Sequence, residues 1–237
     1  MFRISRLHEI MKGLPRGTFE RIVEAHEGDK HSKGFRCWDQ LVAMVYAQLG
    51  GADSLRVLES GFNSQSTHHY HLGTQAIRRS TLADANAARP AAVFAEAARE
   101  LMSQAARRLR RQGEEVLHLL DSTSLTLKGA GFDTWTRATR TRNTQGLKLH
   151  VLYAEEVVLH HNITAPNVND IDEGVKLPIT PGALYVFDKG YCDYNWWQRI
   201  DTQGAQFVTR FKRNAALRVE ELRPIPEQDS EIILTDE

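Results

Sequence analysis

Two aspartates stand in the same local setting and have the residue type for metal-assisted chemistry. Asp121 follows the apolar run at residues 116–120, and Asp188 follows a second apolar run at residues 183–187. Such runs are typical of buried strands, and parallel strands carry functional groups at their carboxyl ends. Two carboxylates brought close together repel one another unless a cation lies between them. The pair therefore points to Mg²⁺ or Mn²⁺, which prefer oxygen ligands and can support phosphodiester hydrolysis or transfer.

Each aspartate taken alone has a simpler interpretation as a helix cap or a turn residue. The elements around them decide how the pair is placed. After Gly113 the pattern predicts strands and two helices. The strands are expected at residues 116–120, 125–128, 147–154, 157–163, 183–187 and 205–211, and the helices at 170–177 and 193–203. Neighbouring strands followed by alternating helices and strands predict a mixed α/β sheet, with Asn169 or Asp170 capping the first helix.

The front of the chain has a helical pattern instead. Helices are expected at residues 37–49, 54–60, 80–86 and 91–112, with Ser54 as an N-cap and Gly61 ending the second helix. The last is rich in Ala, Arg, Glu and Leu, which favour helices. The pattern divides the chain into an all-helical region at 1–113, a mixed α/β region at 114–213, and a polar, β-like segment at 214–237 with strands expected at 217–222 and 232–234.

Charge differs between these halves although the chain is neutral overall. Residues 1–113 carry 17 Lys and Arg against 11 Asp and Glu, a net of +6, and residues 114–237 carry 13 against 19, a net of −6. A basic half suits a polyanion and an acidic half suits cations, although a solvated surface would explain both. The hydrophobic content of 41% supports a folded core, and no apolar run is long enough for a membrane span. Two isolated cysteines favour a reducing cytoplasm over a disulfide framework.

A loop before the strand at 147–154 gathers cations that suit phosphate oxygens: Arg137, Arg140, Arg142 and Lys148. A solvated loop is the alternative. The tract His68-His69-Tyr70-His71 has no second cluster to complete a metal site, so we interpret it as a loop that faces DNA or solvent. The adjacent Trp196 and Trp197 are expected to pack, with one able to face outward.

Four short stretches carry a resemblance to a known family. They are Leu120-Asp121-Ser122-Thr123, residues 164–170, residues 187–191 and residues 207–212, preceded by matching stretches at 31–40 and 80–86. In order and spacing they resemble the insertion-sequence transposases of the IS-four family, DDE enzymes with an RNase H-like core. The resemblance implies that Asp121 and Asp188 are the first two metal ligands. It also implies DNA contacts, for which Lys33, Arg36, Lys189 and Tyr191 are candidates. By the same resemblance, residues 1–113 are a DNA-binding domain, residues 114–213 are a partial catalytic core, and residues 214–237 are the start of a β-rich insertion.

The family's third carboxylate is a glutamate in a Tyr, Arg, Glu and Lys motif that this sequence lacks, so we expect a chain truncated inside the insertion. Asp170, Asp172 and Glu173 could replace that ligand, although helix capping and the helix dipole explain them more simply. The expected function is transposition, by a homodimer that binds double-stranded DNA at element ends and target in the bacterial nucleoid, away from membranes. The alternatives are an inactive DNA-binding remnant that competes with the full-length enzyme, or a different RNase H-like nuclease.

Overall fold

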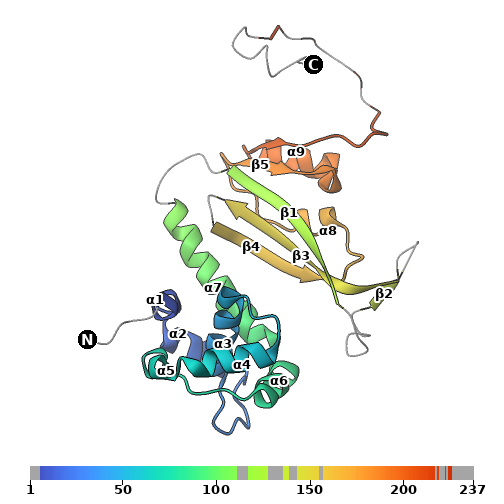
Figure 1. Cartoon of the computed structure of the whole chain (residues 1–237). Coiled ribbons are helices and arrows are strands. Elements are labelled where there is room, and N and C mark those ends of the chain that lie inside the picture. Colours follow the sequence, from blue (N-terminus) through green and yellow to red (C-terminus); the bar gives the residue numbers. More distant parts are fainter. Residues whose placement is uncertain are drawn as a thin grey trace. The chain divides into compact units, whose positions relative to one another are not determined.

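The chain divides into two compact units in the computed structural model, which describes residues 6–110, 117–127, 136–138, 143–154, 157–216, 218, 222 and 224–225. One unit comprises residues 1–114 with 157–160, and the other comprises residues 115–156 with 161–237. Helices build the first and a sheet builds the second (Figure 1). Within the described residues, no helix is long and apolar enough to cross a membrane.

The first unit is a bundle of helices. They are α1 (Arg6–Met11), α2 (Arg16–Ala25), α3 (Cys37–Gly50), α4 (Leu55–Ser64), α5 (Ser66–Leu72), α6 (Arg79–Ala88) and α7 (Ala91–Arg110). The Ser54 hydroxyl caps α4 by accepting a hydrogen bond from the Val57 amide at 3.3 Å, as expected. The prediction that Gly61 ends this helix is wrong. A Cβ on Gly61 would lie 3.2 Å from the Tyr46 hydroxyl, so the glycine instead allows α3 and α4 to approach closely.

The core of this unit is made of buried aromatic and aliphatic side chains, with Phe19 and Phe62 almost fully enclosed. The histidine tract lies on α5, so its interpretation as a loop is wrong. His69 is buried, its ring stacks on Phe62 with centroids 4.5 Å apart, and its Nε2 lies 3.0 Å from the Phe62 carbonyl oxygen. A packed and hydrogen-bonded ring of this kind stabilises the fold and explains why the helix forms there.

The second unit is organised around a mixed sheet. Its strands are β1 (Leu117–Thr126), β2 (Thr136–Ala138), β3 (Asn143–Ala154), β4 (Val157–Thr164), β5 (Leu184–Phe187) and β6 (Gln206–Val208). The order is β2-β3-β1-β5-β6, and β4 also pairs with β3. β1 is antiparallel to β3 and parallel to β5, and β5 is parallel to β6. The expected fold class, an RNase H-like mixed sheet with flanking helices after an all-helical region, is confirmed.

Some strand boundaries differ from the prediction. β1 is one continuous strand through Asp121, where two strands were expected, because its antiparallel pairing with β3 continues from His118 to Thr126. β6 ends at Val208, earlier than expected. The strands predicted at 217–222 and 232–234 fall largely outside the described residues. The continuous β1 matters because Asp121 is then held on a strand by backbone pairing and not by a loop.

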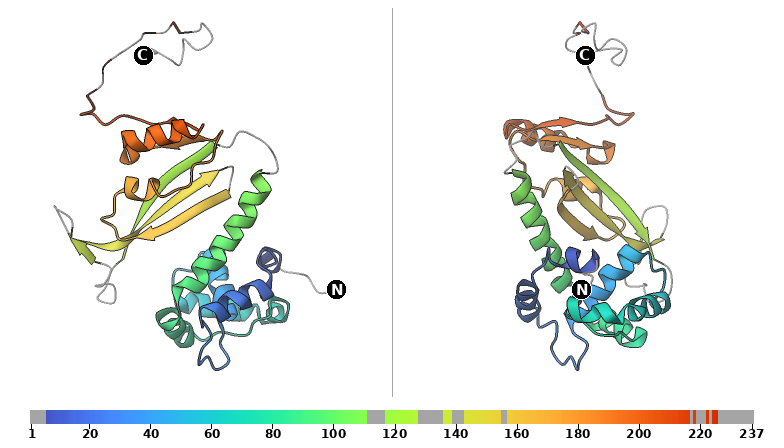
Figure 2. Two further views of the ribbon diagram at one scale, coloured as in Figure 1. Left: turned by 180° about the vertical axis from the view of Figure 1, so that it is seen from behind. Right: turned by 60° about the vertical axis from the view of Figure 1, so that its left-hand side comes forward.

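Helical segments cover one face of this sheet (Figure 2): α8 (Asp170–Gly174), the 3₁₀ turn η2 (Lys189–Tyr191) and α9 (Tyr194–Thr202). The Asp193 carboxylate caps α9 by accepting a hydrogen bond from the Trp196 amide at 2.8 Å. Trp196 and Trp197 are both buried against Phe187, with ring centroids 4.9 and 6.4 Å away. This aromatic packing fixes the segment that follows Asp188.

Candidate active site at the ends of two parallel strands

The parallel register of β1 and β5 places Asp121 and Asp188 next to one another. The parallel pairing runs from Leu117 opposite Leu184 to Leu120 opposite Phe187. Asp121, within β1, and Asp188, just after β5, are the residues that follow this pairing. Both aspartates are exposed, so their carboxylates reach solvent. Neighbouring parallel strands lie about 4.8 Å apart, which places the two carboxylates at one edge of the sheet. This is the arrangement that the sequence predicts.

Asp188 is further fixed by the turn that follows it. Its Oδ1 accepts a hydrogen bond from the Gly190 amide at 2.7 Å and so starts η2. A side chain at Gly190 would push these carboxylates aside, since a Cβ there would lie 2.8 Å from Asp188 Oδ1 and 3.0 Å from Asp170 Oδ2. A third carboxylate, from α8, therefore faces Asp188 across a bare glycine.

Tyr191 is buried beneath these carboxylates, with 1% of its surface exposed. Burial raises the pKa of the Tyr191 phenol well above its usual range, and the negative charges of Asp170, Asp121 and Asp188 raise it further. Ser122 opposes that rise weakly, but the Tyr191 hydroxyl has no hydrogen bond of normal geometry. Tyr191 was predicted to contact DNA. The structure places it in the interior, where it offers no surface to a duplex.

Asp170 does not act as the helix cap expected from the sequence. Asn169, the other residue predicted for this role, occupies the N-cap position of α8, although its side chain makes no cap bond. Asp170 Oδ1 instead accepts a hydrogen bond from Lys148 Nζ at 3.1 Å, and Lys148 also donates to the Val168 carbonyl at 3.0 Å. The Lys148 and Asp170 side chains are 14% and 22% exposed. Lys148, predicted as a phosphate contact, is thus held in a largely buried ion pair.

His150 lies on the other side of Asp170. Its Nε2 lies 2.9 Å from the Thr164 hydroxyl, while its Nδ1 is 3.6 Å from Asp170 Oδ1, too long for a hydrogen bond. Burial lowers the pKa of His150, and the Asp170 charge opposes that shift. The ring is therefore held neutral against the acidic site.

The other two acidic residues of α8 are engaged elsewhere. Glu173 is buried and accepts hydrogen bonds from Asn162 Nδ2 at 2.6 Å and Lys176 Nζ at 2.5 Å. Burial would raise the pKa of Glu173, but these two donors outweigh it and the pKa is lowered. Asp172 is exposed and accepts a hydrogen bond from Asn169 at 3.2 Å. Neither of them points to the site of Asp121 and Asp188.

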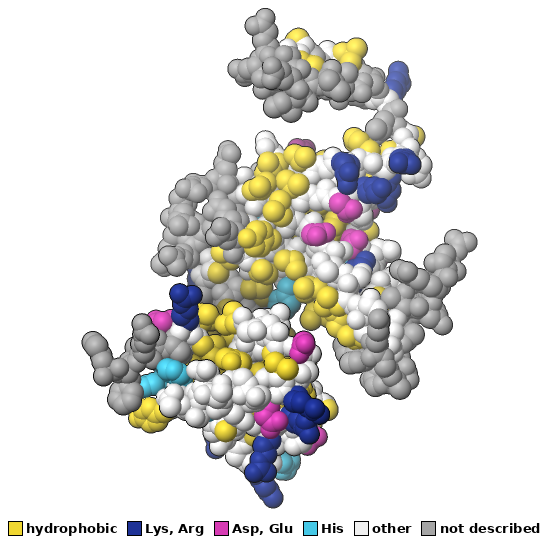
Figure 3. All heavy atoms as spheres, in the orientation of Figure 1, with side chains coloured by type: hydrophobic (Ala, Val, Ile, Leu, Met, Phe, Trp, Pro, Cys, Tyr) yellow, Lys and Arg dark blue, Asp and Glu magenta, His cyan; other side chains and the backbone are white. Residues whose placement is uncertain are grey.

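Exposed cations accompany the carboxylates on the second unit, where Figure 3 shows acidic and basic side chains close together. Lys189 is exposed, as expected of a DNA contact. Sequence reasoning missed Arg210, Lys212 and Arg213, which are exposed after β6. The parallel pairing of β5 with β6 ends at Val186 opposite Val208, and Arg210 follows β6 by two residues. The sequence signal was the group of cations directly after the apolar residues of this last strand. Arg140, Arg142 and the side chain of Arg137 lie outside the described residues.

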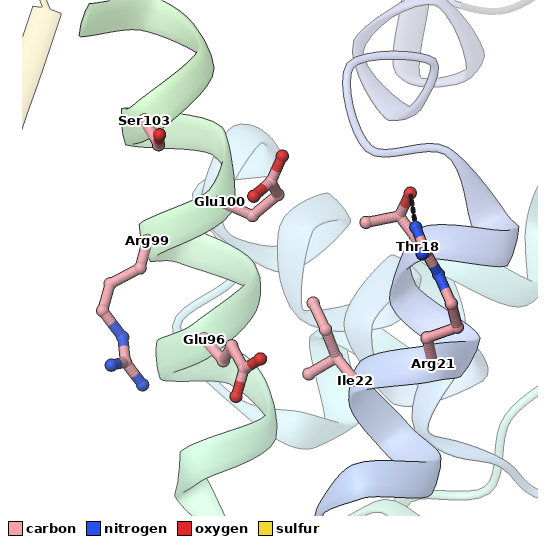
Figure 4. A pocket seen from close by; sticks show the side chains of 7 residues that line it. All are labelled: Thr18, Arg21, Ile22, Glu96, Arg99, Glu100 and Ser103. Atoms are coloured by element: carbon pink, nitrogen blue, oxygen red, sulfur yellow. Dashed lines mark hydrogen bonds between the residues drawn. The ribbon is translucent and has the colours of Figure 1, made fainter.

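Lys33 and Arg36, the candidates in the helical unit, are exposed in the loop before α3. A groove of about 620 Å³ in the same unit lies between α2 and α7 (Figure 4). Its carboxylates already have partners: Glu96 lies 2.5 Å from His26, and Glu100 lies 3.7 Å from Arg107. The groove therefore has no unpaired acidic group comparable to those of the sheet edge.

A divalent cation suits the donor set at the sheet edge. Two exposed carboxylates supply the hard oxygen ligands that Mg²⁺ and Mn²⁺ prefer, and their exposure leaves room for water and phosphate oxygens. Across the described part of the chain, no group of three or more His, Cys, Asp or Glu side chains is arranged to hold a metal ion. The geometry thus offers two protein ligands, Asp121 and Asp188, with Asp170 nearby.

Comparison with known proteins gives relatives for both units. Residues 3–75 match a domain of unknown function. A curated relative, "Putative transposase y4zB" of Sinorhizobium fredii (strain NBRC 101917 / NGR234), is 44% identical over 147 residues, which are 61% of this chain and 40% of that protein. This chain therefore spans less than half of its relative's length.

A solved structure of piggyBac transposase, in a synaptic complex with hairpin DNA, gives a distant likeness: a TM-score of 0.43 at 11% identity, covering 88% of this chain and 49% of that one. The family assignment comes from a different match. The model of the transposase DDE domain matches residues 112–235, just over half of the chain. These residues contain both aspartates of the sheet edge, and the chain belongs to the transposase DDE domain family.

Proposed function

We propose that this chain is a DNA transposase of an insertion sequence of the IS-four type, with Asp121 and Asp188 holding the divalent cations of strand cleavage and transfer. The observation that carries the proposal is the register of β1 and β5, which sets the two aspartates at adjacent positions in a transposase DDE domain. Bound there, Mg²⁺ or Mn²⁺ would activate water and stabilise the leaving oxygen of a phosphodiester.

Different residues of the chain would bind the cations and the DNA. Asp121 and Asp188 hold their carboxylates at the solvent edge of the sheet, where a phosphodiester can approach. Lys189 follows Asp188 directly, and Arg210 lies just beyond the end of β6, which pairs with β5. Both are exposed and suit the phosphate oxygens of the bound strand. Lys33 and Arg36 of the helical domain, residues 1–113, would hold the element ends. A homodimer on DNA in the bacterial nucleoid is the assembly that we propose.

A second candidate is a DNA-binding remnant that cleaves nothing and competes with a full-length enzyme. It is favoured by the lack of a three-ligand metal group among the described residues. The two candidates share the same DNA contacts and differ only in chemistry.

Nicking of element-end DNA in the presence of Mn²⁺ separates these candidates. The transposase proposal predicts that Asp121→Asn and Asp188→Asn each lower the nicking rate by about a hundredfold to a thousandfold, the scale of losing one group that stabilises transition-state charge. Asp172→Asn, an exposed carboxylate change in the same unit, is the matched control and should nick as the wild type does. Wild-type protein that binds the DNA but does not nick it would establish the remnant instead.

A further inference from the structure

Asp170 and Asp188 face one another across Gly190, although eighteen residues separate them in sequence. A single point, the Cβ position of Gly190, lies 3.0 Å from Asp170 Oδ2 and 2.8 Å from Asp188 Oδ1. Like charges brought this close are unfavourable unless a positive group compensates them. Lys148 supplies one such group, but it contacts the other oxygen of Asp170, Oδ1, and leaves Oδ2 facing Asp188.

Two buried polar atoms beside these carboxylates have no hydrogen-bond partner. One is the Tyr191 hydroxyl, whose pKa is raised by burial and by the negative charges of all three aspartates. The other is His150 Nδ1, which lies 3.6 Å from Asp170 Oδ1. Both residues are at least 97% buried. Buried polar groups in native proteins nearly always have a partner, so an orphaned one indicates a bound water or ion.

We propose that Asp170 is an outer-sphere carboxylate of the cation site, which orients the water shell of a divalent cation held by Asp121 and Asp188. Asp170 is thus a positioning residue, and the inference rests on the proposed function. Lys148 fixes its orientation through the bond to Oδ1. An outer-sphere role fits better than direct ligation because one oxygen is already committed to Lys148. The described residues also contain no group of three side chains arranged around a metal.

A favourable interaction with the dipole of α8 is the competing explanation of Asp170, and α8 contains its own control. Asp172 lies in the same turn, so it shares any interaction with the helix dipole. It is exposed and bonds only to Asn169. A role at the cation site therefore predicts different behaviour of the two aspartates, whereas a dipole effect predicts similar behaviour.

Mn²⁺ affinity of the full chain, measured by titration calorimetry, tests the inference without any activity assay. Asp170→Asn should weaken Mn²⁺ binding by about tenfold to a hundredfold, the usual effect of losing an outer-sphere partner. Asp170→Glu should restore part of that loss. Gly190→Ala should weaken binding as well, because its methyl group would separate Asp170 from Asp188. Asp172→Asn should bind Mn²⁺ as the wild type does.

The possible outcomes separate this inference from the proposed function. If Asp121→Asn loses Mn²⁺ while Asp170→Asn retains wild-type affinity, the two-aspartate site stands and the role of Asp170 is overturned. If Asp121→Asn also binds Mn²⁺ normally, the proposed site itself fails, and the inference with it. Should Asp170→Asn not fold, Gly190→Ala decides, and unchanged affinity in that variant overturns the inference.

Discussion

The two units of this chain differ in whether their buried polar side-chain atoms have hydrogen-bond partners. In the part of the helical unit that the structure describes, each such side chain has a hydrogen-bond partner. Asp39 accepts hydrogen bonds from the Arg36 amide at 2.8 Å and the Thr74 hydroxyl at 2.7 Å. Gln40 and His69 are similarly bonded. The sheet unit holds every buried side-chain atom without a partner found among the described residues: His118 Nδ1, His150 Nδ1, Tyr191 Oη, Trp196 Nε1 and Thr209 Oγ1.

This difference indicates that the buried polar groups of the helical unit stabilise its fold, whereas some of those in the sheet unit serve function. A buried polar group without a partner costs about 1–3 kcal/mol, so a fold optimised only for stability would pair or remove it. Proteins keep such groups where function requires them. Here Tyr191 and His150 lie against the carboxylates of the sheet edge, where we propose that the chemistry takes place.

The largest expected effect concerns the core of the helical unit. Phe62 is 1% exposed and packs between Tyr46 and His69. Phe62→Ala should therefore lower the free energy of unfolding by about 3–5 kcal/mol, as measured by urea denaturation followed by circular dichroism. Val57→Ala, on the same helix but 52% exposed, is the control and should cost far less. Equal losses in the two variants would contradict the packing described for this unit.

A smaller effect is expected when a buried polar group with hydrogen-bond partners is compared with one that has none. Asp39→Ala leaves two donors without their acceptor and should lower the free energy of unfolding by about 1–3 kcal/mol. His118→Phe keeps the edge contact with Tyr185 and removes an unpaired nitrogen, so its stability should equal or exceed that of the wild type. The same urea titration measures both. A strongly destabilised His118→Phe would show that the orphaned nitrogen does have a partner.

A pH dependence of stability follows from the same histidine. Burial lowers the pKa of His118 below its ordinary value of about 6.5, so the unfolded chain binds this proton more readily than the folded chain does. Its contribution to stability is complete above pH 6.5 and is lost as the pH falls toward the folded-state pKa, by at most about 1.4 kcal/mol per pH unit. His118→Phe should therefore lose less stability than the wild type between pH 7.5 and 5.5. Parallel losses would contradict this assignment.

The smallest expected effect concerns the exposed cations of the helical unit. If Lys33 and Arg36 contact phosphates, replacing either by alanine should reduce the slope of log binding constant against log salt concentration by about one. Lys30 is the matched control, because its ammonium already pairs with Glu27 at 2.9 Å. Lys30→Ala should leave the slope nearly unchanged. If all three variants behave alike, the contacts with DNA lie elsewhere.

The sequence predicted the features that depend on local pattern. An apolar run ending in aspartate predicted β5, and Asp193 before Tyr194 marked the start of α9. It did not predict the pairing of Asp170 with Lys148 or the burial of Tyr191, because both depend on contacts between distant segments. The end of β1 was misplaced for a similar reason, since its length is set by the facing strand β3 and no local breaker marks it.

Cleavage of the protein backbone by Fe²⁺-generated hydroxyl radicals tests the central claim most directly. Fe²⁺ bound in place of Mg²⁺ cuts the chain near its own position, so the cut sites locate the cation. The account predicts cuts around residues 121 and 188 that Mg²⁺ suppresses and that vanish in Asp121→Asn. Cuts elsewhere in the chain, or the same cuts in Asp121→Asn, would contradict the claim that these two strand-borne carboxylates hold the cation.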